Sequence, residues 1–186
     1  MAGRGVPETV KTKDMTMTAV MAALICAAGP LSIFVGPVPL SLATFAVYLS
    51  GAVLGRKRGT LAVALYLLIG MAGVPVFSGF SGGFQKLAGV TGGYLIGYLP
   101  CAFLAGTGTE RADGGGREAW LRPAMMAAGT AVLYLTGTAW FMVQTGRTVG
   151  EALALCVLPF LPGDAAKIAA ASVLAAPVRR AVLRGG

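Results

Sequence analysis

Two ionisable side chains, Asp164 and Lys167, stand three residues apart in an otherwise apolar stretch, LPFLPGDAAK at residues 158–167. Two prolines and a glycine interrupt the stretch, so Asp164 is placed to cap a new helix with Lys167 on the same face. A carboxylate and an ammonium in apolar surroundings can accept and donate hydrogen bonds to a polar ligand. Ionisable groups inside membrane segments tend to mark substrate or ion paths. A structural ion pair joined to a helix cap is the alternative, and the two interpretations are compatible.

Two further segments combine glycine, proline and polar residues. Residues 36–41 read GPVPLS, and residues 73–94 contain seven glycines, three phenylalanines, Gln85 and Lys86. Glycine lets backbone amides approach a ligand closely, and aromatic rings supply apolar walls. A binding loop and a merely flexible loop both fit this composition.

Several kinds of chemistry are absent. The chain contains no histidine, which removes the usual metal sites and imidazole bases. It has no phosphate-binding loop of the G-x-x-x-x-G-K-[ST] type and no nucleophile motif. Cys26, Cys101 and Cys156 lie in apolar stretches without metal-ligand spacing. We therefore expect no enzyme activity, metal or cofactor, and any uphill transport must take its energy from a partner or an ion gradient.

The elements that must position these residues are membrane helices. The chain has 186 residues, of which 56% are hydrophobic and 12% charged, with mean hydropathy +0.76, whereas soluble domains average about 25% charged. We expect an all-α integral membrane protein with six transmembrane helices of about 20 residues each. The segments are 15–35, 39–55, 60–77, 90–107, 121–143 and a last one within 152–178. The chain is expected to be a single membrane domain over 1–186, with an N-terminal cytoplasmic segment at 1–14, the bundle at 15–180 and a tail at 181–186.

The basic residues predict the orientation. Twelve of the 15 fall on one side if the N-terminus is cytoplasmic: Arg4, Lys11, Lys13, Arg56, Lys57, Arg58, Arg111, Arg117, Arg122, Arg179, Arg180 and Arg184. The outer loops keep Lys86 and Arg147. This asymmetry follows the positive-inside rule, predicts N-in and C-in, and accounts for most of the +8 charge without nucleic acid. The last segment is too long for the bilayer if straight, so we expect a bend near 159–163.

Four segments together resemble one family. They are GPVPLS at 36–41, PVFSGFSGG at 75–83, GVTGGYLIGY at 89–98 and LPGDAAK at 161–167. The chain is similar from about Thr16 to Val178 to the BioY family, the biotin-binding S components of energy-coupling factor (ECF) transporters. The resemblance implies the six-helix S-component fold, biotin held near the outer surface beneath the first and third loops, and a location in a prokaryotic cell membrane. It also implies a membrane coupling subunit and two cytoplasmic ATPases as partners.

Biotin carries a ureido ring, an apolar sulfur-containing ring and a carboxylate. Asp164 can accept from the ureido N–H groups, and Lys167 can donate to the ureido oxygen while neutralising Asp164. We expect polar contacts from Gln85, Thr91 and Thr44, and ring contacts from Phe77, Phe80 and Tyr94. The carboxylate can meet Lys86 or the backbone amides of Gly82 and Gly83, and the sequence does not choose between them.

Two positions depart from the family pattern. Val90 stands where the family usually has proline, and Ala43 stands where it often has glutamine, which removes one amide while Thr44 remains. The alternatives are an S component for another vitamin, a self-sufficient ion-coupled carrier and a structural membrane scaffold. The carrier would need titratable groups that change access, and the scaffold leaves the glycine-rich loops unexplained.

Ala19, Ala23 and Ala27 recur every four residues and form a stripe of small side chains that another helix can approach closely. The resemblance implies that this stripe contacts the coupling subunit, and packing within the chain is the alternative. For Gly93 and Gly97 we expect packing within the chain. We assign Trp120 and Trp140 to the membrane boundaries.

Overall fold

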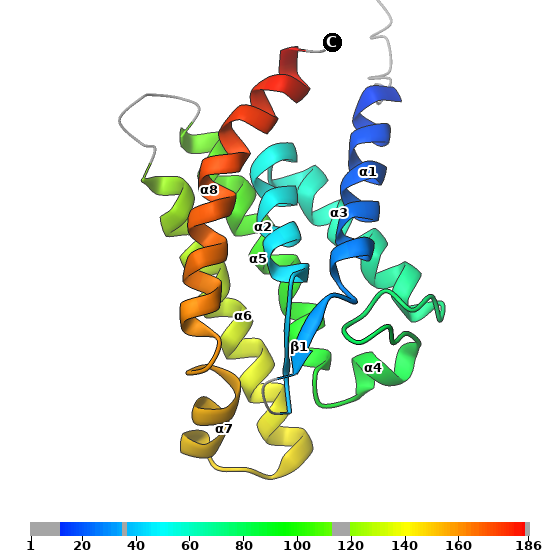
Figure 1. Ribbon diagram of the computed structural model, residues 1–186, viewed down its shortest axis with the longest axis vertical. Helices are drawn as coiled ribbons and strands as arrows, with labels where there is room; N and C mark the ends of the chain where they lie inside the picture. The colour runs from blue at the N-terminus through cyan, green and yellow to red at the C-terminus, as the bar shows by residue number, and fades with distance from the viewer. Residues whose placement is uncertain (1–11, 35–36, 113–119, 185–186) are drawn as a thin grey trace, which may run out of the picture.

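The structure is a computed structural model that describes residues 12–34, 37–112 and 120–184. Within these ranges the chain forms two short strands and eight helices, in the order shown in Figure 1. They are α1 (Thr12–Ala28), β1 (Ser32–Phe34), β2 (Pro39–Ser41), α2 (Ala43–Leu54), α3 (Arg56–Met71), α4 (Phe84–Ala88), α5 (Gly92–Ala112), α6 (Leu121–Thr145), α7 (Val149–Cys156) and α8 (Leu161–Arg184).

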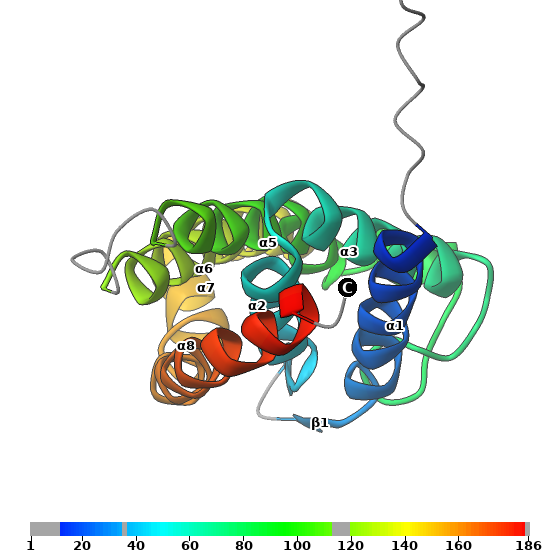
Figure 2. The same ribbon diagram turned by 90° about the horizontal axis from the view of Figure 1, so that it is seen from above.

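Helix α2 lies at the centre of the bundle. Viewed along the long axis, it is surrounded by α1, α3, α5 and α8 (Figure 2), and it contacts all four. Ten of its 12 residues are buried. This position requires a helix that is apolar on every side, which the α2 sequence supplies.

Helices α5 and α6 pack most closely. A Cβ at Gly93 would collide with Trp140, and one at Gly97 would collide with Thr136 and Leu133. The expectation that Gly93 and Gly97 serve internal packing is therefore confirmed. The Trp140 indole also donates to the Gly89 carbonyl at 2.9 Å, so this residue ties α6 to the start of α5.

The two ends of the bundle differ in content. The start of α1, the end of α8 and the α2–α3 junction lie at one end, whereas α4, α7 and the β1–β2 hairpin lie at the other (Figure 1). At the first end, Arg58 pairs with Asp14 and Arg56 pairs with Glu110. Glu110 also accepts from the Arg56 backbone N–H at 2.9 Å, and so satisfies one free donor at the start of α3.

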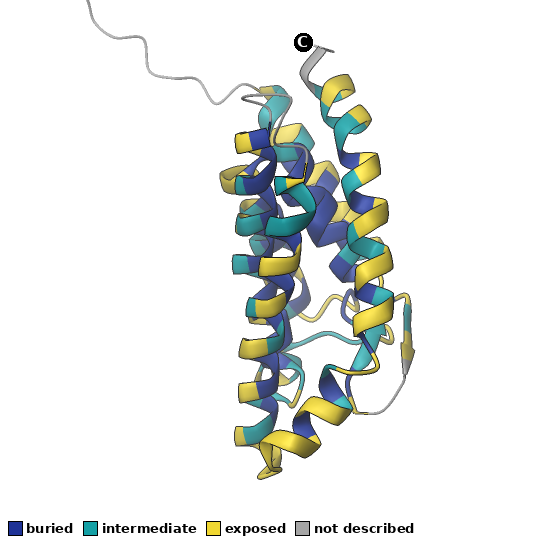
Figure 3. Ribbon diagram, turned by 90° about the vertical axis from the view of Figure 1, so that its left-hand side faces the viewer, coloured by how far each residue is buried: buried dark blue, intermediate teal, exposed yellow. Residues whose placement is uncertain are grey.

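The outer faces of the helices carry apolar residues. Figure 3 shows exposed positions along the outward sides of the long helices. Large hydrophobic residues occupy many of them, including Leu61 53%, Leu68 56%, Leu135 70%, Val143 85% and Val173 73% exposed. Such a surface suits lipid, which supports a membrane protein.

The chain is mostly helical, as expected, and the short β1–β2 hairpin is the part that the expectation of an all-α protein missed. Its strands are antiparallel, with Ser32 opposite Ser41 and Ile33 opposite Leu40. The segment expected as a helix over 15–35 is wrong in its second part, because α1 ends at Ala28. Pro30 lacks a backbone N–H, and the chain turns there into β1.

Other helix boundaries also differ from expectation. Arg56, Lys57 and Arg58 form the first turn of α3 rather than a loop, so α3 begins earlier and ends at Met71 instead of 77. Helix α4 interrupts the glycine-rich loop, and α5 extends to Ala112. Helix α8 continues to Arg184, so the tail expected at 181–186 is helical as far as the structure describes it.

Among the described residues, α6 is the one helix whose length and hydropathy by themselves mark it as a candidate membrane span, and α7 with α8 form a second candidate. The α7–α8 pair is bent by 50° at the break, which confirms the expected bend. Asp164, however, does not cap α8: the helix starts at Leu161, and Asp164 lies in its first turn.

Candidate ligand-binding site

A cavity opens at the end of the bundle that carries α4, α7 and the hairpin. The cavity is lined by Val38, Pro39, Leu40, Ser41, Thr44, Phe77, Ser78, Ser81, Lys86, Thr91, Tyr94, Leu95, Tyr98, Leu133, Tyr134, Cys156, Phe160 and Asp164. The hairpin, the loop before α4 and six helices thus contribute to one site.

Asp164 is the acidic group of the cavity. Its side chain is 7% exposed and forms an ion pair with Lys167, with 2.9 Å between Nζ and Oδ1. The Tyr134 hydroxyl donates to the other oxygen, Oδ2, at 2.6 Å. Each carboxylate oxygen can accept more than one hydrogen bond, so Asp164 is held in one orientation and still has lone pairs for a ligand donor.

Lys167 lies behind this carboxylate rather than in the cavity lining. Besides Asp164, its ammonium donates to the Ser41 carbonyl at 2.7 Å and to Thr44 Oγ1 at 3.1 Å. An ammonium has three donors, and here all three have protein acceptors. The ion pair expected from the three-residue spacing is confirmed.

Aromatic side chains form much of the wall. The Tyr94 hydroxyl is 3.3 Å from Thr138 Oγ1 and donates to the Cys156 carbonyl at 3.3 Å, which links α5 to α6 and α7. The Phe77 ring packs edge-on against Tyr66, with 5.4 Å between ring centroids. A Cβ at Gly70 would collide with the Phe77 ring, so this ring position needs glycine in α3.

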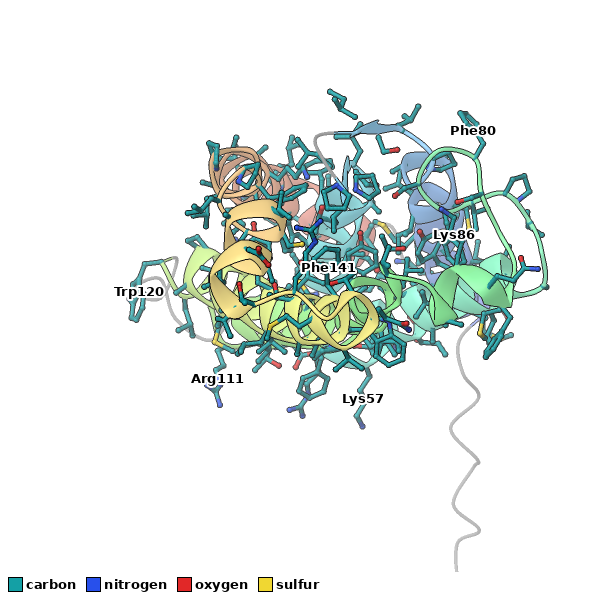
Figure 4. The ribbon with its side chains drawn as sticks, turned by 90° about the horizontal axis from the view of Figure 1, so that it is seen from below. Lys57, Phe80, Lys86, Arg111, Trp120 and Phe141 are labelled. Atoms are coloured by element: carbon teal, nitrogen blue, oxygen red, sulfur yellow. The ribbon has the colours of Figure 1, made fainter. Side chains whose placement is uncertain are left out.

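A tight turn precedes α4. Phe77 and Ser81 pair as in a β-bridge through two backbone hydrogen bonds. Phe80 in this turn has φ 55 and is 70% exposed. In the view onto this end of the molecule, Phe80 lies at the rim and points outward, while Lys86 lies nearer the centre (Figure 4).

The structure brings together part of the expected site. Asp164, Thr44, Phe77, Thr91 and Tyr94 all line the cavity, and Lys86 lines it as well. Lys167, Gln85, Phe80, Gly82 and Gly83 do not. Gln85 and Phe80 are exposed, and the Thr44 hydroxyl is engaged with Ser41 and Lys167.

The two positions that depart from the family pattern lie outside the lining. Ala43 is buried, and its backbone N–H donates to Ser41 Oγ at 2.9 Å. Val90 is 37% exposed.

Sequence reasoning did not find Tyr98, Tyr134, Phe160, Ser78 and Ser81 as cavity residues. Tyr98 is the last residue of the motif at 89–98 and Phe160 precedes the motif at 161–167, and the spacing 94–98 places both tyrosines on one face of α5. Tyr134 had no such signal, because its contact with Asp164 joins residues 30 positions apart.

Among the described residues, no group of three or more Cys, Asp or Glu is placed to hold a metal ion. The positive charge of Lys167 balances the negative charge of Asp164. The remaining charged side chain in the cavity lining is the cationic Lys86. Such a site suits a ligand with hydrogen-bond donors at one end and an anionic group at the other.

Comparisons with known proteins agree with this description. The chain is 39% identical over 168 residues to the probable biotin transporter BioY of Pyrococcus horikoshii, covering 89% of this chain and 96% of that protein. It is 36% identical over 168 residues to the biotin transporter BioY of Thermotoga maritima, covering 90% and 96%.

A solved structure has the same fold. The 2.1 Å crystal structure of the S-component for biotin from an ECF-type ABC transporter matches with a TM-score of 0.79 and 28% identity, covering 98% of this chain and 96% of that one. The model of the BioY family matches residues 4–184. Fold, cavity and sequence together show that the chain belongs to the BioY family.

Proposed function

We propose that this protein is the biotin-binding S component of an ECF-type vitamin transporter. It captures biotin from outside the cell, and partner ATPases supply the energy for delivery inward. The observation that carries the proposal is the cavity in which Asp164, oriented by Tyr134 and Lys167, and the cationic Lys86 line one space. No covalent bond forms or breaks in this chain.

The chemistry of biotin suits this cavity at each part. A ureido N–H donates to Asp164, whose carboxylate is fixed by two other donors. The sulfur-containing ring packs against the aromatic walls, and the carboxylate pairs with Lys86. Within the described part of the chain Lys86 forms no ion pair, so its charge is available to a ligand, whereas Gly82 and Gly83 lie outside the cavity lining.

We further propose that the chain is a single membrane domain that crosses a prokaryotic plasma membrane six times, with both termini inside. The spans are α1, α2, α3, α5, α6 and the bent α7–α8 pair. Two observations support this orientation. Arg56, Lys57 and Arg58 start α3 at the end of the bundle where α1 begins and α8 ends, while Lys86 belongs to α4 at the opposite end.

The partners in this proposal are a membrane coupling subunit and two cytoplasmic ATPases. Ala19, Ala23 and Ala27 are all exposed, although the same helix buries Met21, Ala22 and Ile25. The alanine stripe therefore faces away from the bundle, and a helix of the coupling subunit can approach it closely.

Titration calorimetry of the purified protein tests the assignment. We expect biotin to bind tightly with one site per chain, and riboflavin and thiamin to give no binding heat. Heat from another vitamin without heat from biotin would reject biotin and retain an S component.

Substitution of Lys86 tests the carboxylate end. We expect Lys86→Met to weaken biotin binding by about 10- to 100-fold, the factor for one hydrogen bond to a charged group. The alcohol analogue of biotin, which lacks the carboxylate, should bind both proteins equally, and Lys86→Arg should retain much of the affinity. Equal losses for biotin and its alcohol would show that Lys86 does not meet the carboxylate.

A further inference from the structure

Lys167 connects three parts of the protein that are distant in sequence. Its ammonium binds Asp164 on its own helix, Thr44 at the start of α2 and the carbonyl of Ser41, the last residue of β2. The contact with Ser41 spans 126 residues. The Lys167 side chain is 12% exposed, so these charged hydrogen bonds are largely shielded from water and are stronger than surface contacts.

Ser41 is the residue at which the hairpin joins the bundle. Its buried hydroxyl donates to the Gly29 carbonyl at 3.1 Å, just after α1, and accepts from the Ala43 backbone N–H at 2.9 Å, at the start of α2. Its backbone faces Ser32 across the hairpin. The hydrogen bond from Lys167 to the Ser41 carbonyl therefore restrains the base of the hairpin.

A second hollow lies on the other side of this base. It is lined by Leu31, Ser32, Ile33, Leu40, Ser41, Leu42 and Lys167. Leu40 and Ser41 also line the ligand cavity, so the β2 end of the hairpin is a thin wall between two spaces. Leu40 packs against the core, and among the hydrogen bonds of Ser41, the one from Lys167 is the contact with a charged group.

We propose that Lys167 is a positioning residue that fixes the base of the β1–β2 hairpin to Asp164. The base of the hairpin and the Asp164 carboxylate are then fixed in position relative to each other. When a ligand binds Asp164, the hairpin is therefore already in its binding position. Without Lys167, the base of the hairpin becomes more mobile. We call the contact of Lys167 with Ser41 and Asp164 the brace. The statement about the ligand rests on the proposed function, whereas the brace does not.

Hydrogen exchange of the ligand-free protein tests the brace. In Lys167→Met, we expect amide exchange in residues 31–34 and 39–43 to rise by about tenfold or more, since a hydrogen bond to a charged group is lost. The Leu42 N–H, which donates to the Leu31 carbonyl, is a direct reporter. Exchange in the middle of α6 should remain unchanged.

Lys86→Met is the matched control, because it removes a lysine from the cavity lining that has no contact with Ser41. We expect it to leave hairpin exchange in the ligand-free protein unchanged. With biotin present, Lys167→Met should speed dissociation by about tenfold or more, while the association rate changes less.

Thr44→Val guards against a folding defect in the lysine variant. It removes one acceptor of Lys167 and also the Thr44 hydroxyl that donates to the Ser41 carbonyl, and it keeps the side-chain shape, so hairpin exchange should rise by at least about threefold. If Lys167→Met raises exchange everywhere, Lys167→Gln decides the question, because its amide can still donate a hydrogen bond but carries no charge, and exchange should then rise only in residues 31–34 and 39–43.

Unchanged hairpin exchange in the ligand-free variants would overturn the brace, even if biotin binding weakened. That result would mean that Lys167 acts on the ligand alone. Absence of biotin binding by the unsubstituted protein would reject the proposed function, and the ligand-free exchange would still decide the role of Lys167.

Discussion

Asp164→Asn is expected to weaken biotin binding by about 100-fold or more. Lys167 requires an acceptor beside its ammonium, so the asparagine oxygen must take the Oδ1 position. The amide NH₂ then occupies the Oδ2 position and presents a donor to a ligand that also donates. Truncating one partner of a buried charged hydrogen bond typically costs ~2–5 kcal/mol. Titration calorimetry measures the loss.

Two further variants separate binding from folding. Asp164→Asn leaves the buried Lys167 ammonium without a counter-charge, which lowers stability. The double variant Asp164→Asn/Lys167→Met removes both charges, so we expect it to recover thermal stability and not binding. Tyr134→Phe, which removes only the donor to Oδ2, should weaken biotin binding by about tenfold. An Asp164→Asn protein with undiminished affinity would contradict this role for the carboxylate.

Ala23→Leu is expected to reduce biotin uptake by about tenfold or more while leaving biotin binding within about twofold. Ala23 is exposed in the middle of the alanine stripe, and a larger side chain there holds a partner helix at a distance. Excess volume in a close-packed contact typically costs ~1–3 kcal/mol. Uptake of labelled biotin by cells that co-express the partner subunits measures the effect.

Ala139→Leu on α6 is the control, because Ala139 is also exposed but lies outside the stripe. We expect normal uptake and binding from it. Co-purification with the coupling subunit should fail for Ala23→Leu and succeed for Ala139→Leu. Full biotin uptake by the Ala23→Leu protein would show that the alanine stripe does not contact the coupling subunit.

The sequence determined the features that depend on composition and near neighbours. The shortage of charge indicated a membrane protein, the prolines and glycine of residues 159–163 predicted a bend that lies between α7 and α8, and the three-residue spacing placed Asp164 and Lys167 on one face. Small residues at 93 and 97 predicted close packing of α5. Each of these follows from a local pattern, because helix geometry fixes which neighbouring residues share a face.

The tertiary structure decided the features that depend on distant residues. It paired residues 32–34 with 39–41 in a hairpin, placed Tyr134 on Asp164, and directed Lys167 to Ser41 and away from the cavity lining. It also separated Lys86, which lines the cavity, from its exposed neighbour Gln85. A side chain's direction and its partners across the bundle depend on how whole helices pack, and sequence spacing does not encode that packing.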